Sequence, residues 1–331
     1  CPAANPDNAM ISYFGDALYG FKALFDPTIK VGGYSTDPVV RQQEQLANVG
    51  KVLTVLGKLS AGLSSGAWPD TASPAGKALE AAKIPSRSAL LAVGLMAGIP
   101  TRSKHVDGTS GPAGAAETYP LAVAPAVAIL ENMGTVGVAG CLLIADGELL
   151  AGGKVFDNSK TDYAARVAAD RDIYSFAFSG NSAVDAMLGA LAATPRETAD
   201  AAALAKVPSL IGLKGEITKP TVMIAAESDE YTPASIAQWY VDGYGDQFAK
   251  AKEAAIAAAK SSRNYQAPVN KLVMLWAKTA PKYSKFTAAG SPDLNAAVGA
   301  GTGHCLYTSA QWLAAAKMIA AAVNTGKFPN Q

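Results

Sequence analysis

The sequence predicts an α/β fold with a small parallel-sheet core near its C-terminal end, preceded by a large and mostly helical region. Two observations support this prediction. Almost no alternating strand pattern occurs before residue 210, and TVMIAA (221–226) is an apolar run followed by an acidic turn and a helix. An apolar run bounded by turn signals is typical of a parallel strand that is buried on both faces.

Composition narrows the class of protein. The chain has 331 residues, of which 50% are hydrophobic, and this is enough for one large domain or two modest ones. The net charge is +1, and no run of Lys or Arg occurs, so nucleic acid is not an expected partner. The apolar stretches 88–98 and 121–130 are too short to span a bilayer, so no membrane span is expected.

Helical spacing recurs through the N-terminal region. Residues 8–24 place apolar groups at helical intervals, and the Asp-Pro step at 26–27 ends that helix. Ser73 and Pro74 suit the cap and the first turn of another helix, over 73–84. The same spacing predicts further helices over 39–63, 88–98, 117–133 and 161–170.

The C-terminal region begins with the strand TVMIAA, which a Lys-Pro step precedes and the acidic turn ESDEYTP follows. A helix is expected to start at Pro233 or Ala234. Beyond it, the pattern predicts helices over 246–262 and 270–280, a strand in LNAAVGAG (294–301) and a last helix over 309–323. Two strands do not make a stable sheet alone, so we expect the rest of the sheet to come from outside this chain.

The order strand, acidic turn, helix, strand, Gly-His-Cys, helix resembles the C-terminal end of an α/β-hydrolase. More narrowly, the chain is similar to secreted actinobacterial esterase/lipase-like hydrolases with a large helical cap. The stretches that carry the likeness are YGFKALFDP (19–27), SPAGKALEAA (73–82), GGKVFDNSKTDYAARV (152–167), KPTVMIAAESDEYTP (219–233) and GTGHCLYT (301–308).

The resemblance implies a division of the chain and a missing part. Residues 1–12 correspond to the end of the core after the nucleophile region, 13–214 to the helical cap, and 215–331 to the C-terminal core. The family's Gly-x-Ser-x-Gly turn lies in the preceding chain. The expected partner is therefore an N-terminal chain or segment that carries the serine and the oxyanion-binding N–H groups. A large apolar cap suggests an ester with a bulky or hydrophobic group.

His304 and Asp229 are the expected base and acid of a Ser-Asp-His triad. Glycines before His304 allow a tight turn at a strand end, which exposes the imidazole toward a serine hydroxyl. A triad acid fixes the histidine tautomer and stabilises the imidazolium, and the family places it in the turn after the penultimate strand. Asp229 fits that position better than its neighbours Glu227 and Glu230.

Two other nucleophiles are considered. Gly62-Leu63-Ser64-Ser65-Gly66 matches Gly-x-Ser-x-Gly, but a helical pattern precedes it and Ala-Trp-Pro follows it, whereas a nucleophile elbow needs a strand before and a helix after. Cys1 is the other, as the nucleophile of a self-contained N-terminal-nucleophile amidohydrolase with its α-amine as base. A third alternative is a non-catalytic cap or binding module.

The chain starts with Cys1, and its alanine-rich, weakly charged composition with three cysteines suits a secreted or cell-surface protein. Lipoprotein maturation, autoproteolysis and internal cleavage of a precursor all expose an N-terminal cysteine. Internal cleavage agrees best with the missing nucleophile region. The sequence alone does not choose among the cysteine pairings.

The resemblance also suggests a disulfide. A cysteine beside the catalytic histidine is similar to that of tannase-like and feruloyl-esterase-like hydrolases, in which a disulfide ties the histidine loop to the nucleophile region. We expect a Cys1–Cys305 bridge, with pairing of Cys305 to a cysteine in the missing segment as the competing arrangement. Cys141, in CLLIA, is expected to be a buried and inert thiol.

The remaining candidates lie in the predicted cap. Phe156, Asp162 and Tyr163 resemble a cap motif of the family and could face the substrate cleft, although helix capping by Thr161 or Asp162 explains the same pattern. His105, in a polar loop, is expected to be a solvated histidine. No metal-ligand spacing and no phosphate-binding glycine loop occur, so no cofactor is expected.

Overall fold

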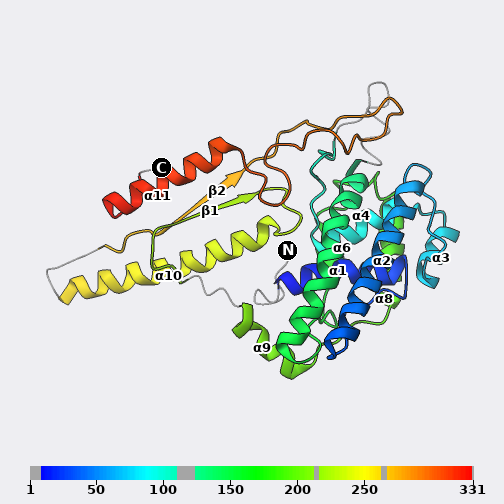
Figure 1. Cartoon of the computed structure of the whole chain (residues 1–331), viewed down its shortest axis with the longest axis horizontal. Helices are drawn as coiled ribbons and strands as arrows, with labels where there is room; N and C mark the ends of the chain where they lie inside the picture. Colours follow the sequence, from blue (N-terminus) through cyan, green and yellow to red (C-terminus); the bar gives the residue numbers. More distant parts are fainter. Residues whose placement is uncertain (1–8, 110–123, 212–215, 262–266, 330–331) are drawn as a thin grey trace. The chain divides into compact units, whose positions relative to one another are not determined.

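The computed structural model describes residues 9–109, 124–211, 216–261 and 267–329 (Figure 1). The chain divides into two compact units. Unit 1 comprises Cys1–Ile211 together with Ala280–Gly299, and unit 2 comprises Gly212–Thr279 together with Ala300–Gln331. The first boundary lies close to the one that the sequence suggests. The assignment of 280–299 to unit 1 differs from the prediction, which placed all of 215–331 in one domain.

Unit 1 is built from helices, as predicted. They are α1 (Ala9–Leu24), α2 (Pro38–Gly62), α3 (Pro74–Ala81), α4 (Ser86–Ala97), α6 (Ala124–Ala151), α7 (Tyr163–Ala168), α8 (Asn181–Ala193) and α9 (Ala201–Ile211). The polar residues that the sequence places at helix starts act as caps. Asp37 accepts hydrogen bonds from the N–H groups of Val39 and Val40, and the Ser73 hydroxyl accepts one from Gly76.

Helix α6 is the centre of unit 1, where it packs against α1, α2, α4 and α9 (Figure 1). Glycines allow these close approaches. A Cβ added to Gly137 would stand 2.7 Å from a methyl group of Val52 on α2, and one added to Gly94 on α4 would stand 2.5 Å from Ile129 on α6. The sequence predicted a helix only over 117–133. Its first residues, 117–123, lie outside the described residues, and the helix continues to Ala151.

The sequence predicted no membrane span, and because of the length of α6 this stays a prediction. Among the described residues, α6 is the one helix that is long and apolar enough to cross a membrane, judged by length and composition. Of its most apolar window, 61% is buried inside the protein. Core helices pass the same test, and the packing of α6 against four other helices accounts for its apolar character.

The segment 280–299 joins unit 1 through a buried carboxylate. Asp107 is fully buried, and its Oδ2 accepts hydrogen bonds from the backbone N–H groups of Tyr283 (2.9 Å) and Ser284 (3.1 Å). The Tyr283 hydroxyl donates to the carbonyl of Ser103 at 2.6 Å. Because these bonds link residues about 177 apart in sequence, a reading of local patterns could not foresee them.

Unit 2 has an α/β architecture. Strands β1 (Thr221–Ala226) and β2 (Leu272–Ala277) pair in parallel, with Thr221 opposite Leu272 and Ala226 opposite Ala277. Helices α10 (Ala234–Ser261) and α11 (Ser309–Thr325) cover opposite faces of this sheet (Figure 1). The sequence located β1 and α11 correctly, and it predicted the start of α10.

The second strand was predicted in the wrong place. Residues 270–280 were expected to be helical, but LVMLWA within them is β2, and LNAAVGAG (294–301) forms turns and irregular backbone instead of a strand. By its periodicity alone, a short apolar run fits a helix or a strand equally well. Pairing with β1 decides the matter here, since each strand satisfies the backbone groups of the other.

Candidate active site

The turn that carries His304 is preceded by two residues that contact the backbone just after β1. Thr302 forms an isolated parallel bridge with Ser228, and the Gly303 N–H donates to the Ser228 carbonyl at 3.3 Å. Gly301 and Gly303 both have left-handed backbone, with φ of 74° and 66°. A Cβ at Gly301 would stand 2.4 Å from the carbonyl oxygen of Lys278, so only glycine fits this turn.

Two hydroxyl groups connect the three segments that meet at this turn by hydrogen bonds. The hydroxyls of Ser228 and Thr279 lie 3.0 Å apart, and Thr279 donates to the Gly301 carbonyl at 3.2 Å. Both side chains are buried. The ends of β1 and β2 and the approach to His304 are therefore held in one hydrogen-bonded group, at the carboxyl edge of the sheet, where α/β proteins place their ligands.

Asp229 is buried directly after β1 and is held by the turn that it begins. Its Oδ1 accepts hydrogen bonds from the N–H groups of Tyr231 and Thr232, both at 2.8 Å, and its Oδ2 accepts one from the Thr232 hydroxyl at 2.8 Å. The side chain is 2% exposed. These three donors fix the carboxylate in position and satisfy it as an anion.

The structure brings His304 and Asp229 together. His304 Nδ1 lies 3.0 Å from Asp229 Oδ2 and 3.3 Å from the Thr232 hydroxyl oxygen. An ionised carboxylate only accepts, so Nδ1 carries the proton, and Thr232 can accept from the same N–H while donating to Asp229. Nε2 is then the basic nitrogen. The imidazole is 42% exposed, so a reacting group can reach it.

Three other residues of the turn, Glu227, Glu230 and Tyr231, lie close to Asp229 in the sequence. Glu227 is exposed, and its backbone N–H pairs with the carbonyl of Ala277. Glu230 is buried beside Asp229. The Tyr231 ring packs against the imidazole, with ring centroids 5.0 Å apart. Thr232 and Tyr231 were missed at the sequence level, although a Thr three residues after an Asp is a recognisable turn signal.

The second ring nitrogen of His304 has a partner on the next residue. Cys305 Sγ lies 3.4 Å from Nε2. The backbone at Cys305 is left-handed, with φ of 58°, which is uncommon for a residue with a side chain. Burial, and then the negative charge of Asp229, raise the pKa of the Cys305 thiol.

Cys305 is a free, exposed thiol in this structure, and Cys141 is a free, buried one. The buried position of Cys141 agrees with the sequence. Cys1, the predicted disulfide partner of Cys305, lies outside the described residues. The Cys1–Cys305 disulfide therefore stays a prediction.

The residues after Cys305 anchor the turn to the sheet and to α11. The Tyr307 hydroxyl donates to the Ile224 carbonyl in β1 at 3.0 Å. Burial, with the nearby Cys305 and Asp229 charges, raises the pKa of Tyr307 to about 12, so the hydroxyl stays a donor at neutral pH. Thr308 and Gln311 form a capping box that starts α11.

The Gly-x-Ser-x-Gly match does not have the context of a nucleophile elbow. Ser64 is exposed in a turn after α2, and the helix, not a strand, leads into it. The Ser64 carbonyl accepts a hydrogen bond from Arg87. The structure thus confirms the local context that made Ser64 a poor candidate.

The three candidates from the cap motif have structural contacts inside unit 1. Phe156 and Tyr163 are buried, and Asp162 caps α7 by accepting from the Ala165 N–H. The Tyr163 hydroxyl donates to buried Asp16 at 2.5 Å, and Arg166 pairs with the same carboxylate. These contacts favour the capping interpretation, and a position on a substrate cleft stays a prediction.

His105 is not the solvated residue that the sequence suggested. Its Nδ1 lies 2.7 Å from Glu131 Oε1 on α6, and the Ser103 hydroxyl donates to Glu131 Oε2 at 2.6 Å. The side chains of His105 and Glu131 are 15% and 18% exposed. The Ser103 hydroxyl is bonded to the carboxylate and not to the imidazole, so these three residues lack the order of a triad.

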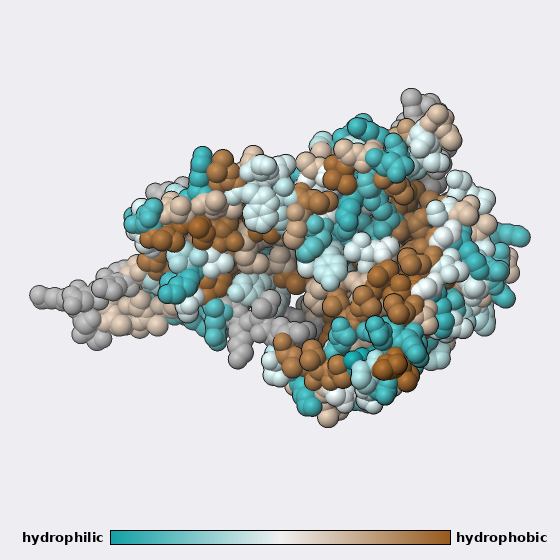
Figure 2. All heavy atoms as spheres, viewed as in Figure 1, coloured by the Kyte–Doolittle hydropathy of each residue, from teal (hydrophilic) through white to brown (hydrophobic). Residues whose placement is uncertain are grey.

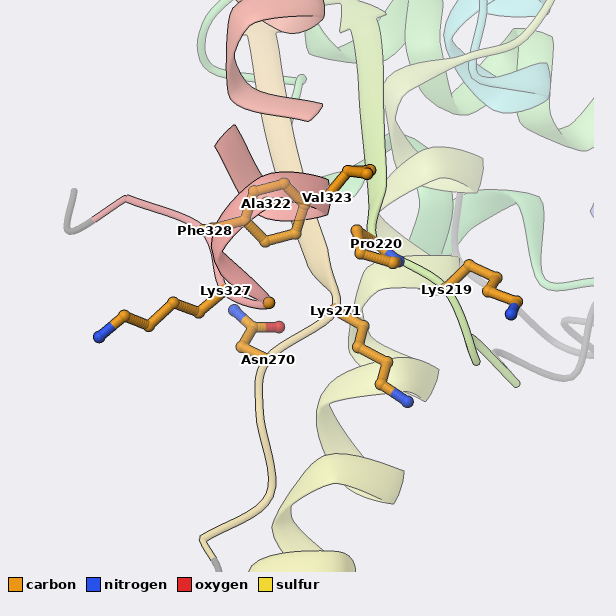
Figure 3. Close-up of a pocket in the computed structure, with 9 residues that line it drawn as sticks. Lys219, Pro220, Asn270, Lys271, Ala322, Val323, Lys327 and Phe328 are labelled. Atoms are coloured by element: carbon orange, nitrogen blue, oxygen red, sulfur yellow. The ribbon is translucent and has the colours of Figure 1, made fainter. Parts of the chain in front are cut away.

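A cavity of about 370 Å³ lies at the opposite edge of the sheet, near the amino ends of β1 and β2. Lys219, Lys271 and Lys327 surround an apolar floor that includes Val323 and Phe328. Figure 3 shows the three lysine side chains pointing away from one another. They do not converge on a common anion, and the cavity lies away from His304.

Among the described residues, no group of three or more His, Cys, Asp or Glu side chains is arranged to hold a metal ion. The chain matches no protein family, no curated protein and no solved structure. The arrangement of side chains around His304 is therefore the basis on which a function is proposed.

Proposed function

We propose that this chain is part of a serine hydrolase that cleaves carboxylic esters, with His304 as base and Asp229 as the acid that orients it. The observation that carries the proposal is the 3.0 Å contact between His304 Nδ1 and Asp229 Oδ2. It joins residues 75 apart in sequence at the carboxyl edge of parallel strands. The buried acid and the exposed imidazole suit a catalytic base that meets substrate.

In this proposal, His304 Nε2 takes the proton of a serine hydroxyl as the serine attacks the ester carbonyl. The imidazolium then returns the proton to the leaving alcohol, and a second cycle with water releases the acid. Asp229 keeps Nδ1 protonated and stabilises the imidazolium, while Thr232 and the Tyr231 N–H hold Asp229. An alkoxide leaving group is protonated as it departs, which is why the base must be within reach of both oxygens.

We place the serine in a chain or segment outside residues 1–331, and unit 2 as the last part of an α/β-hydrolase core, with unit 1 as its cap. The two-stranded parallel sheet supports this placement, since parallel strands are normally buried within larger sheets. The first four residues of β1 are only partly buried. On α11, Trp312, Leu313 and Val323 are exposed, and apolar patches appear over this helix in Figure 2.

The proposal is tested on the protein purified from its natural source. A fluorophosphonate probe labels the activated serine, and peptide mapping locates it. We expect the label on a peptide that does not belong to residues 1–331. Labelling of Ser64, or hydrolysis of esters by His304→Ala at the wild-type rate, contradicts the proposal. His105 is the other of the two histidines in the sequence, so His105→Ala is the matched control.

A further inference from the structure

We infer that Cys305 is itself a nucleophile, which His304 activates and which accepts acyl groups from thioesters and aryl esters. The inference rests on the same His304–Asp229 pair as the proposed function, but it needs no residue outside unit 2. The observation behind it is the order of atoms: Asp229 Oδ2 to Nδ1 at 3.0 Å, and Nε2 to Cys305 Sγ at 3.4 Å. This is the order acid, base, nucleophile.

The hydrogen-bonding groups around the ring fix its direction. Asp229 and Thr232 surround Nδ1, so its proton lies there and Nε2 presents a lone pair. Sγ is the polar atom that the structure places at Nε2, and a thiol can donate to it. Cys305 lies in a turn with left-handed backbone, and its Sγ lies beside the imidazole of the preceding residue.

The surroundings make His304 necessary for attack. Partial desolvation of the exposed Cys305 thiol, and then the negative charge of Asp229, raise its pKa, so the thiol is neutral at physiological pH. A neutral thiol is a weak nucleophile, and its proton must leave as the new bond forms. Both Cys305 and the imidazole are exposed to solvent, so an acyl donor can approach them.

The reaction balances without a further reagent. Sγ bonds to the acyl carbon while its proton passes to Nε2. The tetrahedral intermediate then expels the thiolate or aryloxide of the donor, which takes that proton from the imidazolium. An S-acyl Cys305 remains, and water attacks it with His304 as base to release the carboxylic acid and the thiol.

The same chemistry defines the class of substrate. In the tetrahedral intermediate, the group of lower pKa leaves faster. An alkoxide is a much stronger base than the Cys305 thiolate, so an intermediate formed from an alkyl ester goes forward only as fast as the imidazolium protonates the departing oxygen, and it otherwise returns to the starting ester. Thiolates and aryloxides leave readily. Cys305 is therefore suited to thioesters and aryl esters, whereas the serine of the proposed function is suited to alkyl esters.

The test exposes the purified chain, under non-denaturing conditions, to the acetyl thioester of N-acetylcysteamine and to p-nitrophenyl acetate. Mass spectrometry of the intact protein and of its peptides locates the acetyl group. We expect one acetyl group on the peptide that contains Cys305, removable by neutral hydroxylamine as a thioester is. Cys305→Ser and Cys305→Ala should not give this product, and buried Cys141 serves as an internal control.

A second test distinguishes a thiol that His304 activates from a thiol that reacts only because it is exposed. At neutral pH, His304→Ala and His304→Gln should acylate about 10²–10⁴-fold more slowly, as expected for loss of general-base catalysis. Well above the thiol pKa, alkylation by iodoacetamide should be equal in wild type and both variants, which also shows that they are folded and accessible. Equal acylation rates at neutral pH, or a Cys305 that is disulfide-bonded in the purified protein, overturn the inference.

The outcomes for the two proposals differ. Alkyl-ester turnover that survives in Cys305→Ala, together with no acylation of Cys305, removes this inference and leaves the serine mechanism. In the protein purified from its natural source, acylation of Cys305 without any alkyl-ester turnover removes the serine mechanism and leaves this inference.

Discussion

The two histidines of the chain each pair with a carboxylate, one in each unit, and the pairs differ in which partner is buried. In unit 1, the side chains of His105 and Glu131 are 15% and 18% exposed. In unit 2, the Asp229 side chain is 2% exposed and the His304 side chain is 42% exposed. The contact in unit 1 is the shorter of the two, at 2.7 Å against 3.0 Å. Distance alone therefore does not separate the pair that we propose as catalytic from the other pair.

The surroundings of each pair explain the difference. Glu131 lies on α6 and receives His105 and Ser103 from the adjoining loop, so this pair fastens a loop to a helix. Asp229 is held by three donors from its own turn, and the far nitrogen of His304 meets a thiol. A base must be exposed enough to meet its substrate, and the His304 side chain is 42% exposed against 15% for His105.

The largest expected effect is on catalysis by the His304 pair. In the preparation that hydrolyses esters, His304→Ala should lower kcat by about 10⁶-fold, as removal of a triad base does. His105→Ala should leave kcat nearly unchanged. Steady-state hydrolysis of a chromogenic alkyl ester measures both. A comparable loss in the two variants would remove the distinction between the pairs.

Substitution of the carboxylate partners should also lower kcat in unit 2 and not in unit 1, and the loss should be smaller than for the histidines. Asp229→Asn keeps the size of the side chain but no longer fixes the tautomer of His304, and kcat should fall by about 10⁴-fold. Glu131→Gln is the matched control in unit 1 and should retain activity. If Glu230→Gln, and not Asp229→Asn, abolishes hydrolysis, the acid has been assigned to the wrong residue.

The two thiols should titrate differently. Burial raises the pKa of Cys141 from 9.0 to about 12, so at neutral pH its thiolate fraction, and its alkylation rate, should be about 10³-fold lower than in the unfolded chain. The same shift contributes stability that is present below pH 9 and is lost as the pH rises through about 12. Iodoacetamide labelling at pH 8, with and without urea, checks this, and Cys305 should react in both conditions.

For the free energy of unfolding, we expect the His105 variant to have the larger effect and the His304 variant the smaller one. His105→Ala removes a charge-assisted contact and should lower the free energy of unfolding by about 1–2 kcal/mol, from urea titration. His304→Ala removes an exposed ring and should change it by less. A larger loss of stability in His304→Ala would mean that the turn at the end of the sheet, and not the helical unit, depends on its histidine.

The smallest effect is expected at Ser64. This residue is exposed after α2. Its backbone carbonyl, and not its hydroxyl, accepts the hydrogen bond from Arg87. Ser64→Ala should leave ester hydrolysis unchanged and the free energy of unfolding within about 0.5 kcal/mol. Loss of hydrolysis in this variant would place the nucleophile in unit 1 and reopen the assignment of the serine.

The sequence by itself determined the local features of this protein. Apolar periodicity located most helices of unit 1, β1 and α11, because each depends on which face of a short segment is apolar. The residues before and in the turns, such as Ser73 and the glycines before His304, identified helix starts and the exposed histidine turn. Asp229 and His304 could be named as a candidate pair because the resemblance places the acid in the turn after a strand and the base after a glycine turn.

Only the tertiary structure decided what depends on distant partners. LVMLWA became β2 because β1 satisfies its backbone. Helix α6 continues beyond residue 133, where Gly137 and Gly140 allow α2 and α1 to approach it closely. His105 found Glu131, Asp107 captured the segment 280–299, and Cys305 turned back onto His304. Each of these outcomes depends on contacts or backbone angles that helical and strand periodicities do not encode, so no local pattern could have predicted them.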